Sequence, residues 1–223
     1  SREQPLKLPL KKYTPILSLS GSEHFADVII PTHDDWARAV YQETGDTILF
    51  QNKTYPKVTL VPWKNKIPKV IFRGTTTGAG TTPETNHRLR LYEYVTHLQQ
   101  PESSYFDVGF TKWNIRPRKH ESSPYFDIIR RTKYPTVPFM SPQDQSRYKY
   151  ILNVEGHVAA FRLSYETSFG SVILMVESEW KLWFSFMFHP WIHYVPVKAD
   201  LSNLVEMVKS VSYTHLTLPT KRI

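Results

Sequence analysis

The chain has 223 residues and carries 28 Lys and Arg residues against 20 Asp and Glu residues, a net charge of +8 at pH 7. It contains no cysteine, which excludes disulfides and cysteine–zinc sites. The lack of cysteine and of a visible targeting segment together weakly favour the cytoplasm. No stretch reaches the roughly 20 consecutive apolar residues that cross a bilayer, so we expect a soluble protein without a membrane span. The positive charge favours an anionic ligand or partner.

Residues 1–62 are predicted to be part of an N-terminal α/β domain. The run PILSLS at 15–20 predicts a short strand. In THDDW, Thr32 is suited to cap a helix whose first turn holds Asp34 and Asp35. A histidine beside two carboxylates is also a set of ligands that a hard cation accepts, but helix capping explains these residues more simply. Because the chain begins at a serine, we expect this domain to be incomplete.

Residues 63–210 are predicted to form a second domain. The apolar run at 69–73 predicts a buried strand that stops at Gly74. After a loop of threonines and glycines, Thr82 is expected to cap a helix with Pro83 at its first position. The following segment, 101–145, is rich in proline and charge, and we expect one strand within it.

From Tyr148 onward, strand and helix patterns alternate. The predicted strands are 149–156, 171–176 and 191–197, and the predicted helices are 157–170, 178–188 and 200–210. Short apolar runs separated by helices are typical of a parallel sheet, so the fold class is α/β. Ligands of such sheets bind where the strands end, which predicts that loops 74–82 and 155–158 lie at one edge.

The last residues, 211–223, are expected to carry no function. They begin with VSYTHLTLPT, which is the translation of a common transposon-style sequencing adapter. We therefore predict that they are a read-through artefact.

The loop after the first predicted strand is a candidate anion site. Its backbone N–H groups from Gly74 onward, the hydroxyls of Thr75 and Thr77 and a helix N-terminus are all suited to phosphate. Arg73, Arg88 and Arg90 are near enough in sequence to clamp a diphosphate. The loop matches neither a P-loop nor a dinucleotide motif, so an ordinary glycine and threonine turn is an equal alternative.

Arg162 is the second candidate. It follows Gly156, Ala159 and Ala160, whose small size permits close approach of a ligand, and its guanidinium is suited to bidentate phosphate contact. The alternative is an arginine that reaches solvent from an amphipathic helix. No D-x-D triplet occurs, which argues against the metal-dependent sugar-nucleotide enzymes that hold their cation with it. We expect no metal and no other cofactor.

Two further segments have alternative interpretations. The basic runs at 114–120 and 128–133 are compatible with nucleic-acid binding, but no recognition module accompanies them and a solvated face is expected. The aromatic stretch at 180–193 is compatible with a membrane surface, but an ordinary core or interdomain helix is expected.

Several blocks of sequence resemble glycosyltransferase family 90, which includes protein O-glucosyltransferases and fungal capsule xylosyltransferases. The block YKYILNVEGHVAAFRLSYETSFGSVILMVESEWKLWFSFMFHPWIHYVPVKADLSNLVE is similar to the C-terminal core of that family. VIFRGTTTGAGTTPETNHR is similar to its phosphate loop, and PILSLSGSEHFADVIIPTHDDW to its preceding acceptor-side segment. The particular sequence of this chain, including DVGFTKWNIRPRK, is similar to versions of the family encoded by giant viruses and marine microbes.

The resemblance implies a GT-B-like fold with two facing Rossmann-type domains. It also implies inverting, metal-independent transfer of glucose or xylose from a UDP-sugar to a hydroxyl of a protein or glycan. In this interpretation the donor is bound by residues of both loops: Arg73, Gly74, Thr75, Thr77, Arg88, Gly156, Ala159, Ala160 and Arg162. Arg162 corresponds to the arginine that stabilises the leaving group, while Glu155 departs from the family's arginine.

The resemblance also implies a catalytic base. The family's base is an aspartate upstream of the segment PILSLS, and we expect it before Ser1, so that this chain binds UDP without transferring sugar. Two other functions stay open: a basic protein that binds nucleic acid or another anionic polymer, and a non-catalytic relative that binds glycan.

Overall fold

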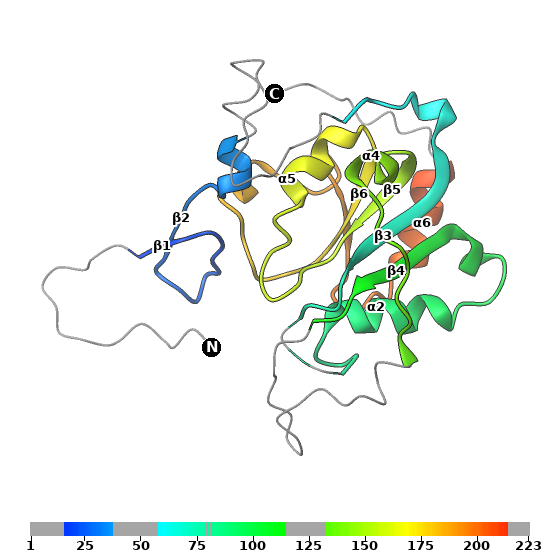
Figure 1. The fold of residues 1–223 in the computed structure, drawn as a ribbon, viewed down its shortest axis with the longest axis horizontal. Helices are drawn as coiled ribbons and strands as arrows, with labels where there is room; N and C mark the ends of the chain where they lie inside the picture. Colours follow the sequence, from blue (N-terminus) through cyan, green and yellow to red (C-terminus); the bar gives the residue numbers. More distant parts are fainter. Residues whose placement is uncertain (1–15, 38–57, 79, 81, 115–132, 214–223) are drawn as a thin grey trace, which may run out of the picture. The chain divides into compact units, whose positions relative to one another are not determined.

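A computed structural model describes residues 16–37, 58–78, 80, 82–114 and 133–213. These residues divide into two compact units (Figure 1). The described part of the first unit is 16–37 and 178–188, and the second unit contains the remaining described residues. The predicted domain boundary at 62 and the predicted artefact at 211–223 stay predictions.

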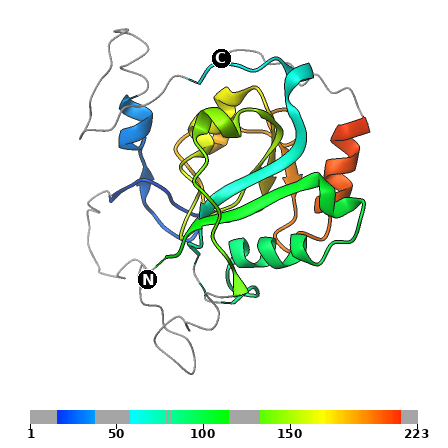
Figure 2. The same ribbon diagram turned by 45° about the vertical axis from the view of Figure 1, so that its right-hand side comes forward.

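The second unit is built on a five-stranded parallel sheet with the order β4-β3-β5-β6-β7 (Figures 1 and 2). The strands are β3 (Ile67–Thr75), β4 (Phe106–Lys112), β5 (Tyr148–Asn153), β6 (Val172–Val176) and β7 (Val195–Val197). The parallel α/β prediction is therefore confirmed, including a strand within 101–145. The chain runs outward in one direction from β3 to β4 and in the other from β5 to β7, so the strand order reverses between β3 and β5.

Helices cover both faces of this sheet (Figure 2). The helices α2 (His87–Thr96) and α6 (Leu204–Tyr213) lie on one face, and α4 (Pro142–Gln145) and α5 (Leu163–Glu166) lie on the other. Side chains alternate along β3 because successive residues of a strand point to opposite faces. Val70 and Phe72 therefore pack with α2 and α6, while Ile71 packs in a second cluster with Phe169. Short 3₁₀ helices complete the unit: η1 (Trp63–Asn65), η2 (Glu102–Tyr105) and η3 (Thr167–Phe169).

The start of α2 differs from the prediction. The helix begins at His87 rather than at Thr82 and Pro83, because Asn86 caps it. The Asn86 Oδ1 accepts hydrogen bonds from the backbone N–H groups of Arg88 and Leu89, at 3.0 and 3.2 Å. Thr82 begins a turn instead. The predicted end of the preceding strand at Gly74 was also wrong, because β3 stays paired with β4 through Thr75.

The predicted helix at 157–170 is only partly present. Residues 157–162 form a loop, after which α5 and η3 follow and end at Gly170, a left-handed residue with φ of 63°. The helix does not begin at 157 because the Val158 carbonyl, which a helix would direct to the N–H of residue 162, accepts instead from the Gly156 N–H at 3.0 Å. The predicted helix at 200–210 is confirmed with a shift, since α6 begins at Leu204.

The first unit contains a small parallel pair, β1 (Leu17–Ser18) and β2 (Val28–Ile29). Residues 33–37 are helical, and the cap at Thr32 is confirmed: its Oγ1 accepts from the Asp35 N–H at 3.1 Å. The Asp35 carboxylate accepts in return from the Thr32 backbone N–H at 3.1 Å, which is the reciprocal geometry of a capping box.

The aromatic segment 178–188 is not the helix that its composition predicted. Only η4 (Ser185–Met187) is helical, because Lys181 exchanges two backbone hydrogen bonds with Gly21, at 2.7 and 3.1 Å. The predicted strand at 191–197 is likewise reduced to β7, its last three residues. Throughout the described chain, every helix falls short of the length and apolar character that crossing a membrane requires.

Candidate anion-binding site

The candidate site lies where the strand order reverses, at the carboxyl ends of β3 and β5. Ligands of open parallel sheets bind in the crevice at such a point. The pairing of β3 with β5 ends at Ile71 and Ile151, whereas β3 continues beside β4 to Thr75. The two central strands therefore separate at their ends, and the loops that follow them face each other. The prediction that these loops share one edge is confirmed.

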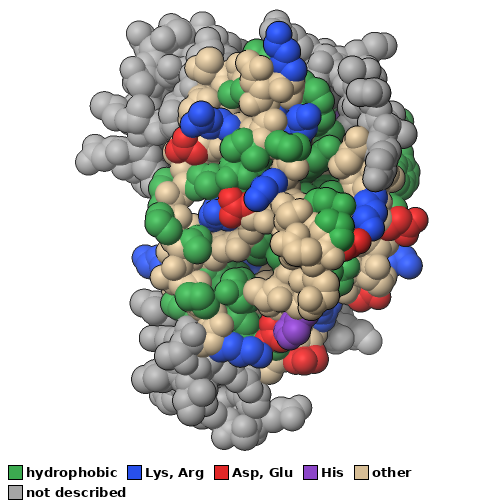
Figure 3. Space-filling model, turned by 90° about the vertical axis from the view of Figure 1, so that its right-hand side faces the viewer, with side chains coloured by type: hydrophobic (Ala, Val, Ile, Leu, Met, Phe, Trp, Pro, Cys, Tyr) green, Lys and Arg blue, Asp and Glu red, His purple; other side chains and the backbone are tan. Residues whose placement is uncertain are grey.

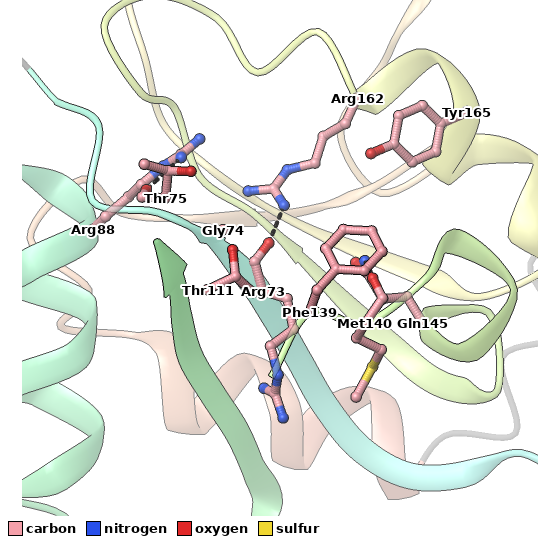
Figure 4. A pocket seen from close by; sticks show the side chains of 10 residues that line it. All are labelled: Arg73, Gly74, Thr75, Arg88, Thr111, Phe139, Met140, Gln145, Arg162 and Tyr165. Atoms are coloured by element: carbon pink, nitrogen blue, oxygen red, sulfur yellow. Dashed lines mark hydrogen bonds between the residues drawn. The ribbon is translucent and has the colours of Figure 1, made fainter. Parts of the chain in front are cut away.

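Two arginines meet over Gly74 at this separation: Arg88 from the first turn of α2 and Arg162 from the loop after β5 (Figure 4). A Cβ atom built on Gly74 would lie 3.1 Å from Nη2 of Arg162 and 3.3 Å from Nη1 of Arg88. Both guanidinium groups also lie over the Phe72 ring, at 4.9 Å for Arg162 and 5.6 Å for Arg88. Because glycine has no side chain, the two cations approach the backbone of β3 and each other closely.

Arg88 is held in a fixed position by backbone carbonyls. Its Nη1 donates to Thr75 O at 2.8 Å, and its Nε and Nη2 donate to Glu155 O and Val154 O at 2.9 and 3.1 Å. It is 8% exposed. Burial, reinforced by the positive charge of Arg162, lowers the pKa of Arg88 to about 9, which leaves it charged at neutral pH. Arg88 thus joins the ends of β3 and β5 and adds a positive charge at neutral pH.

Arg162 keeps one donor unused. Its Nη1 donates to the carbonyl of Arg73, a backbone group in the part of β3 that has separated from β5. Its Nε lies 3.4 Å from the Glu166 carboxylate. The Nη2 atom is buried and donates to no acceptor within the part of the chain that the structure describes. Buried donors are nearly always paired, and a charged one is suited to an anion.

The buried carboxylate of Glu166 helps to orient Arg162. It is 1% exposed, and its Oε2 accepts from Asn153 Nδ2 at 2.7 Å. Burial raises the pKa of Glu166, although Arg162 and Asn153 act in the opposite direction. The side chain of Arg162 is therefore fixed by a carboxylate, a carbonyl and an aromatic ring, rather than extended into solvent as the alternative interpretation required.

A polar network shapes the loop that follows β3. His157 Nδ1 lies 3.0 Å from Gly78 O, and its Nε2 lies 3.2 Å from Asn114 Nδ2. Since a carbonyl only accepts and an amide nitrogen only donates, this arrangement fits a neutral imidazole with its proton on Nδ1. The Asn114 N–H donates to Thr76 Oγ1 at 3.0 Å. The loops after β3, β4 and β5 are thereby joined.

Sequence reasoning missed the network residues Asn86 and Asn114, and it interpreted His157 only as an unclustered histidine with a structural role. Asn86 was detectable, because an asparagine before the amphipathic run HRLRLYEYV is a strong N-cap signal. Besides capping α2, its Nδ2 donates to Gly80 O at 3.1 Å. Nothing in the local sequence pointed to Asn114 or His157, whose partners are 38 and 79 residues away.

The structure separates the other predicted residues into two groups. Thr75 lines the pocket. Gly156 packs against residues of the site, since a Cβ atom built on Gly156 would lie 2.5 Å from Thr77 Oγ1 and 3.3 Å from Arg88 Nη2. Ala159 and Ala160 lie in the loop before Arg162 but do not line the pocket.

Arg73 lines the pocket but directs its guanidinium to Asp107, and Arg90 does not line the pocket. The Arg73 guanidinium points away from the other two arginines (Figure 4), and its Nη2 lies 2.5 Å from Asp107 Oδ1. Arg90 donates to the carbonyls of Pro83 and Ala199, at 3.0 and 2.8 Å. The clamp that the structure forms is therefore Arg88 with Arg162.

The pocket between these groups has a volume of about 270 Å³. Thr75, Thr111 and Tyr165 contribute hydroxyl groups, and Phe139 lies at one side (Figure 4). Within the described residues, no three His, Cys, Asp or Glu side chains gather as metal ligands would. The site therefore offers a small anion the side chains of two arginines, several hydroxyl groups and the backbone at Gly74 as possible partners.

The surface charge is mixed on the face shown in Figure 3. Lys and Arg side chains there alternate with Asp and Glu and with hydrophobic side chains, so the described residues of that face form no continuous basic field. The basic runs that raised the nucleic-acid alternative fall almost entirely outside the described residues.

Comparison with known proteins was made for the whole chain. Residues 2–216 match the family described as "Glycosyl transferase family 90". An uncharacterized protein of invertebrate iridescent virus 6 is 39% identical over 92% of this chain. Human protein O-glucosyltransferase 3 is 30% identical over 87% of the chain, and human protein O-glucosyltransferase 1 is 26% identical over 88%. The chain spans 20%, 34% and 47% of the lengths of these relatives, respectively.

Proposed function

The chain belongs to glycosyltransferase family 90, and we propose that its Arg88–Arg162 site binds the diphosphate of a UDP-sugar whose glucose or xylose is transferred to a hydroxyl group. One observation carries the proposal: two guanidinium groups meet above Gly74, and Nη2 of Arg162 is buried without an acceptor in the described chain. A diphosphate oxygen supplies the missing acceptor. The names of the O-glucosyltransferase relatives support glycosyl transfer as the reaction class.

The proposed reaction is a direct displacement at the anomeric carbon. The acceptor oxygen forms a bond to this carbon as the bond to the UDP oxygen breaks, which inverts the configuration. Negative charge develops on the β-phosphate, where Arg162 and Arg88 are positioned to stabilise it. A base must take the acceptor proton, and no described residue is assigned that role. The acceptor is a hydroxyl of a protein or a glycan.

No cofactor is proposed. The positive charge that many transferases obtain from a divalent cation is here supplied by two arginines, one of them fixed by three carbonyl groups. The GT-B arrangement of two facing domains is likewise proposed from the family alone.

Calorimetric titration with UDP, UDP-glucose and UDP-xylose tests the site. In buffer containing EDTA, wild type is expected to bind, and Arg162→Ala to bind at least 10-fold more weakly, since a charged hydrogen bond contributes roughly 1.5–3 kcal/mol. Lys198→Ala, which removes an exposed cation elsewhere, is the matched control. Equal affinity of wild type and Arg162→Ala would contradict the assignment.

The same titration separates the alternatives. Binding of single-stranded DNA that falls steeply with salt, without any binding of UDP, would favour an anionic-polymer protein. Binding of glycan without UDP would favour a non-catalytic relative.

A further inference from the structure

A second cavity adjoins the anion site, and we infer that it holds the nucleobase of the donor, stacked on Phe139. The inference rests on the proposed function, since it needs a nucleotide in the first pocket. The second cavity has a volume of about 420 Å³. Arg73, Phe139 and Met140 line both cavities, so the two cavities adjoin along these side chains.

The size of the anion pocket calls for such an extension. Its 270 Å³ lies below the roughly 300–1,000 Å³ typical of small-molecule sites. A nucleotide whose diphosphate contacts Arg88 and Arg162 must therefore extend beyond it. The neighbouring cavity lies within the same unit, and Phe139 lies at its boundary with the anion pocket.

Phe139 is suited to stacking because most of its ring is available. It is 78% exposed and follows Pro138 in an extended, irregular segment. Isolated exposed apolar side chains are common on protein surfaces. Phe139 differs from them because it borders a pocket with two cations on one side and a larger cavity on the other. Stacking of bases on aromatic side chains is a general mode of nucleotide recognition.

Arg73 and Tyr148, which line the second cavity, are both bonded to Asp107, which does not line it. Asp107 accepts from Arg73 Nη2 at 2.5 Å and from the Tyr148 hydroxyl at 2.7 Å. Burial and the hydrogen bond to Asp107 raise the pKa of Tyr148 to about 12, so the hydroxyl keeps its proton at neutral pH. The charge of Arg73 is therefore offset by Asp107, and this arginine is not part of the phosphate clamp.

The rim of the cavity has groups that match the edge of a base. Asp144 and Arg147 are exposed and line the cavity. A carboxylate accepts from a ring N–H, and a guanidinium donates to a ring carbonyl, which are the two kinds of group that uracil presents. An apolar platform with polar groups at its margin favours a flat base over a sugar, whose hydroxyls need partners on all sides.

The test compares UDP with inorganic pyrophosphate, which has the phosphates but no base. We expect Phe139→Ala to bind UDP about 10-fold more weakly than wild type, as loss of one stacking contact implies. Its affinity for pyrophosphate should be unchanged, which also shows that the variant is folded. Phe139→Tyr should keep the wild-type affinity for both ligands. Phe186→Ala, which removes a similarly exposed phenylalanine, is the matched control.

The outcomes distinguish the two proposals. If wild type and Phe139→Ala bind UDP equally while Arg162→Ala binds it weakly, the nucleobase site is wrong and the diphosphate site stands. If Phe139→Ala loses UDP and pyrophosphate to the same extent, Phe139 acts on the anion pocket and the inference is overturned. If wild type binds neither ligand, both proposals fail.

Discussion

Nε of Arg162 lies 3.4 Å from Oε1 of Glu166, a carboxylate that is 1% exposed. The pair belongs to the loop and helix that follow β5, and the other end of the Arg162 guanidinium bonds the backbone of β3. Glu166 and the β3 backbone hold Nε and Nη1 of Arg162, which leaves its Nη2 available to a ligand. The site is therefore organised before any ligand is bound.

The first prediction concerns the charge of Glu166. Because burial raises its pKa, the folded protein holds this proton to a higher pH than the unfolded chain does. Ionisation therefore costs stability: between the ordinary pKa of 4.5 and the raised value, the free energy of unfolding should fall with increasing pH. Glu166→Gln lacks this group, so its curve should fall less steeply in that window.

Urea denaturation of both proteins from pH 4 upward measures this difference. The variant serves as the control for every other titrating group, since those are shared. Parallel curves for wild type and Glu166→Gln would show that the environment of Glu166 does not disfavour its charge.

The second prediction concerns Lys66, which is 4% exposed. Its ammonium donates to the carbonyls of Ser146 and Phe169 and to the Ser171 hydroxyl, all of them uncharged. Burial lowers the pKa of Lys66 from 10.5 to about 8. Between these values the unfolded chain holds more protons than the folded protein, so stability should rise with pH.

The comparison variant is Lys66→Met, which keeps the length of the side chain without its charge. Relative to this variant, wild type should gain on the order of 2 kcal/mol between pH 8 and 10.5, since one pKa unit corresponds to about 1.4 kcal/mol. Chemical denaturation at several pH values measures the gain. A wild type that loses stability in this window relative to Lys66→Met would contradict the prediction.

The third prediction concerns Gly74. A methyl group at this position would lie 3.1–3.3 Å from Arg162, Phe72 and Arg88, closer than unstrained contact allows. The guanidinium groups are the ends of flexible side chains, so they should move while β3 remains intact. We expect Gly74→Ala to weaken UDP binding by about 10-fold, a loss of about 1.4 kcal/mol.

Calorimetry measures the affinity of Gly74→Ala, and thermal unfolding checks that its stability stays within about 1 kcal/mol of wild type. An unchanged affinity would mean that the two arginines do not need their present positions above Gly74.

The fourth prediction concerns Asn86, which is 1% exposed. Asn86→Ala removes the cap of α2 and also leaves Gly80 O without its side-chain donor. We expect a loss of about 2–3 kcal/mol in the free energy of unfolding, from the cap and the buried hydrogen bonds together. Ser141→Ala, which removes the half-buried cap of α4, should cost only about 0.5–1 kcal/mol.

Urea denaturation of the two variants gives the comparison. Equal losses would indicate that Asn86 acts as a cap alone and does not hold the loop after β3.

The parallel α/β fold was predictable because periodicity is a local property. Short apolar runs such as 69–73 and 171–176 identify buried strands, and their separation by helices implies parallel connections. Boundaries were less predictable. The prediction placed the start of α2 at Thr82, where proline and threonine are typical of a helix N-terminus, but Asn86 bonds two amides and determines the start. The aromatic run 178–188 failed as a helix because its backbone pairs with Gly21, more than 150 residues earlier.

The candidate site was predictable in its residue types but not in its pairing. The sequence by itself determined that arginines, threonines and glycines follow two neighbouring strands, and that such loops share one edge of a parallel sheet. Only the tertiary structure decided which arginines meet. Arg73 turns to Asp107 and Arg90 to Ala199, while Arg88 and Arg162, 74 positions apart, converge above Gly74. The physical reason is that a guanidinium binds whichever carbonyl or carboxylate the fold brings within about 3 Å, and those partners come from distant parts of the chain.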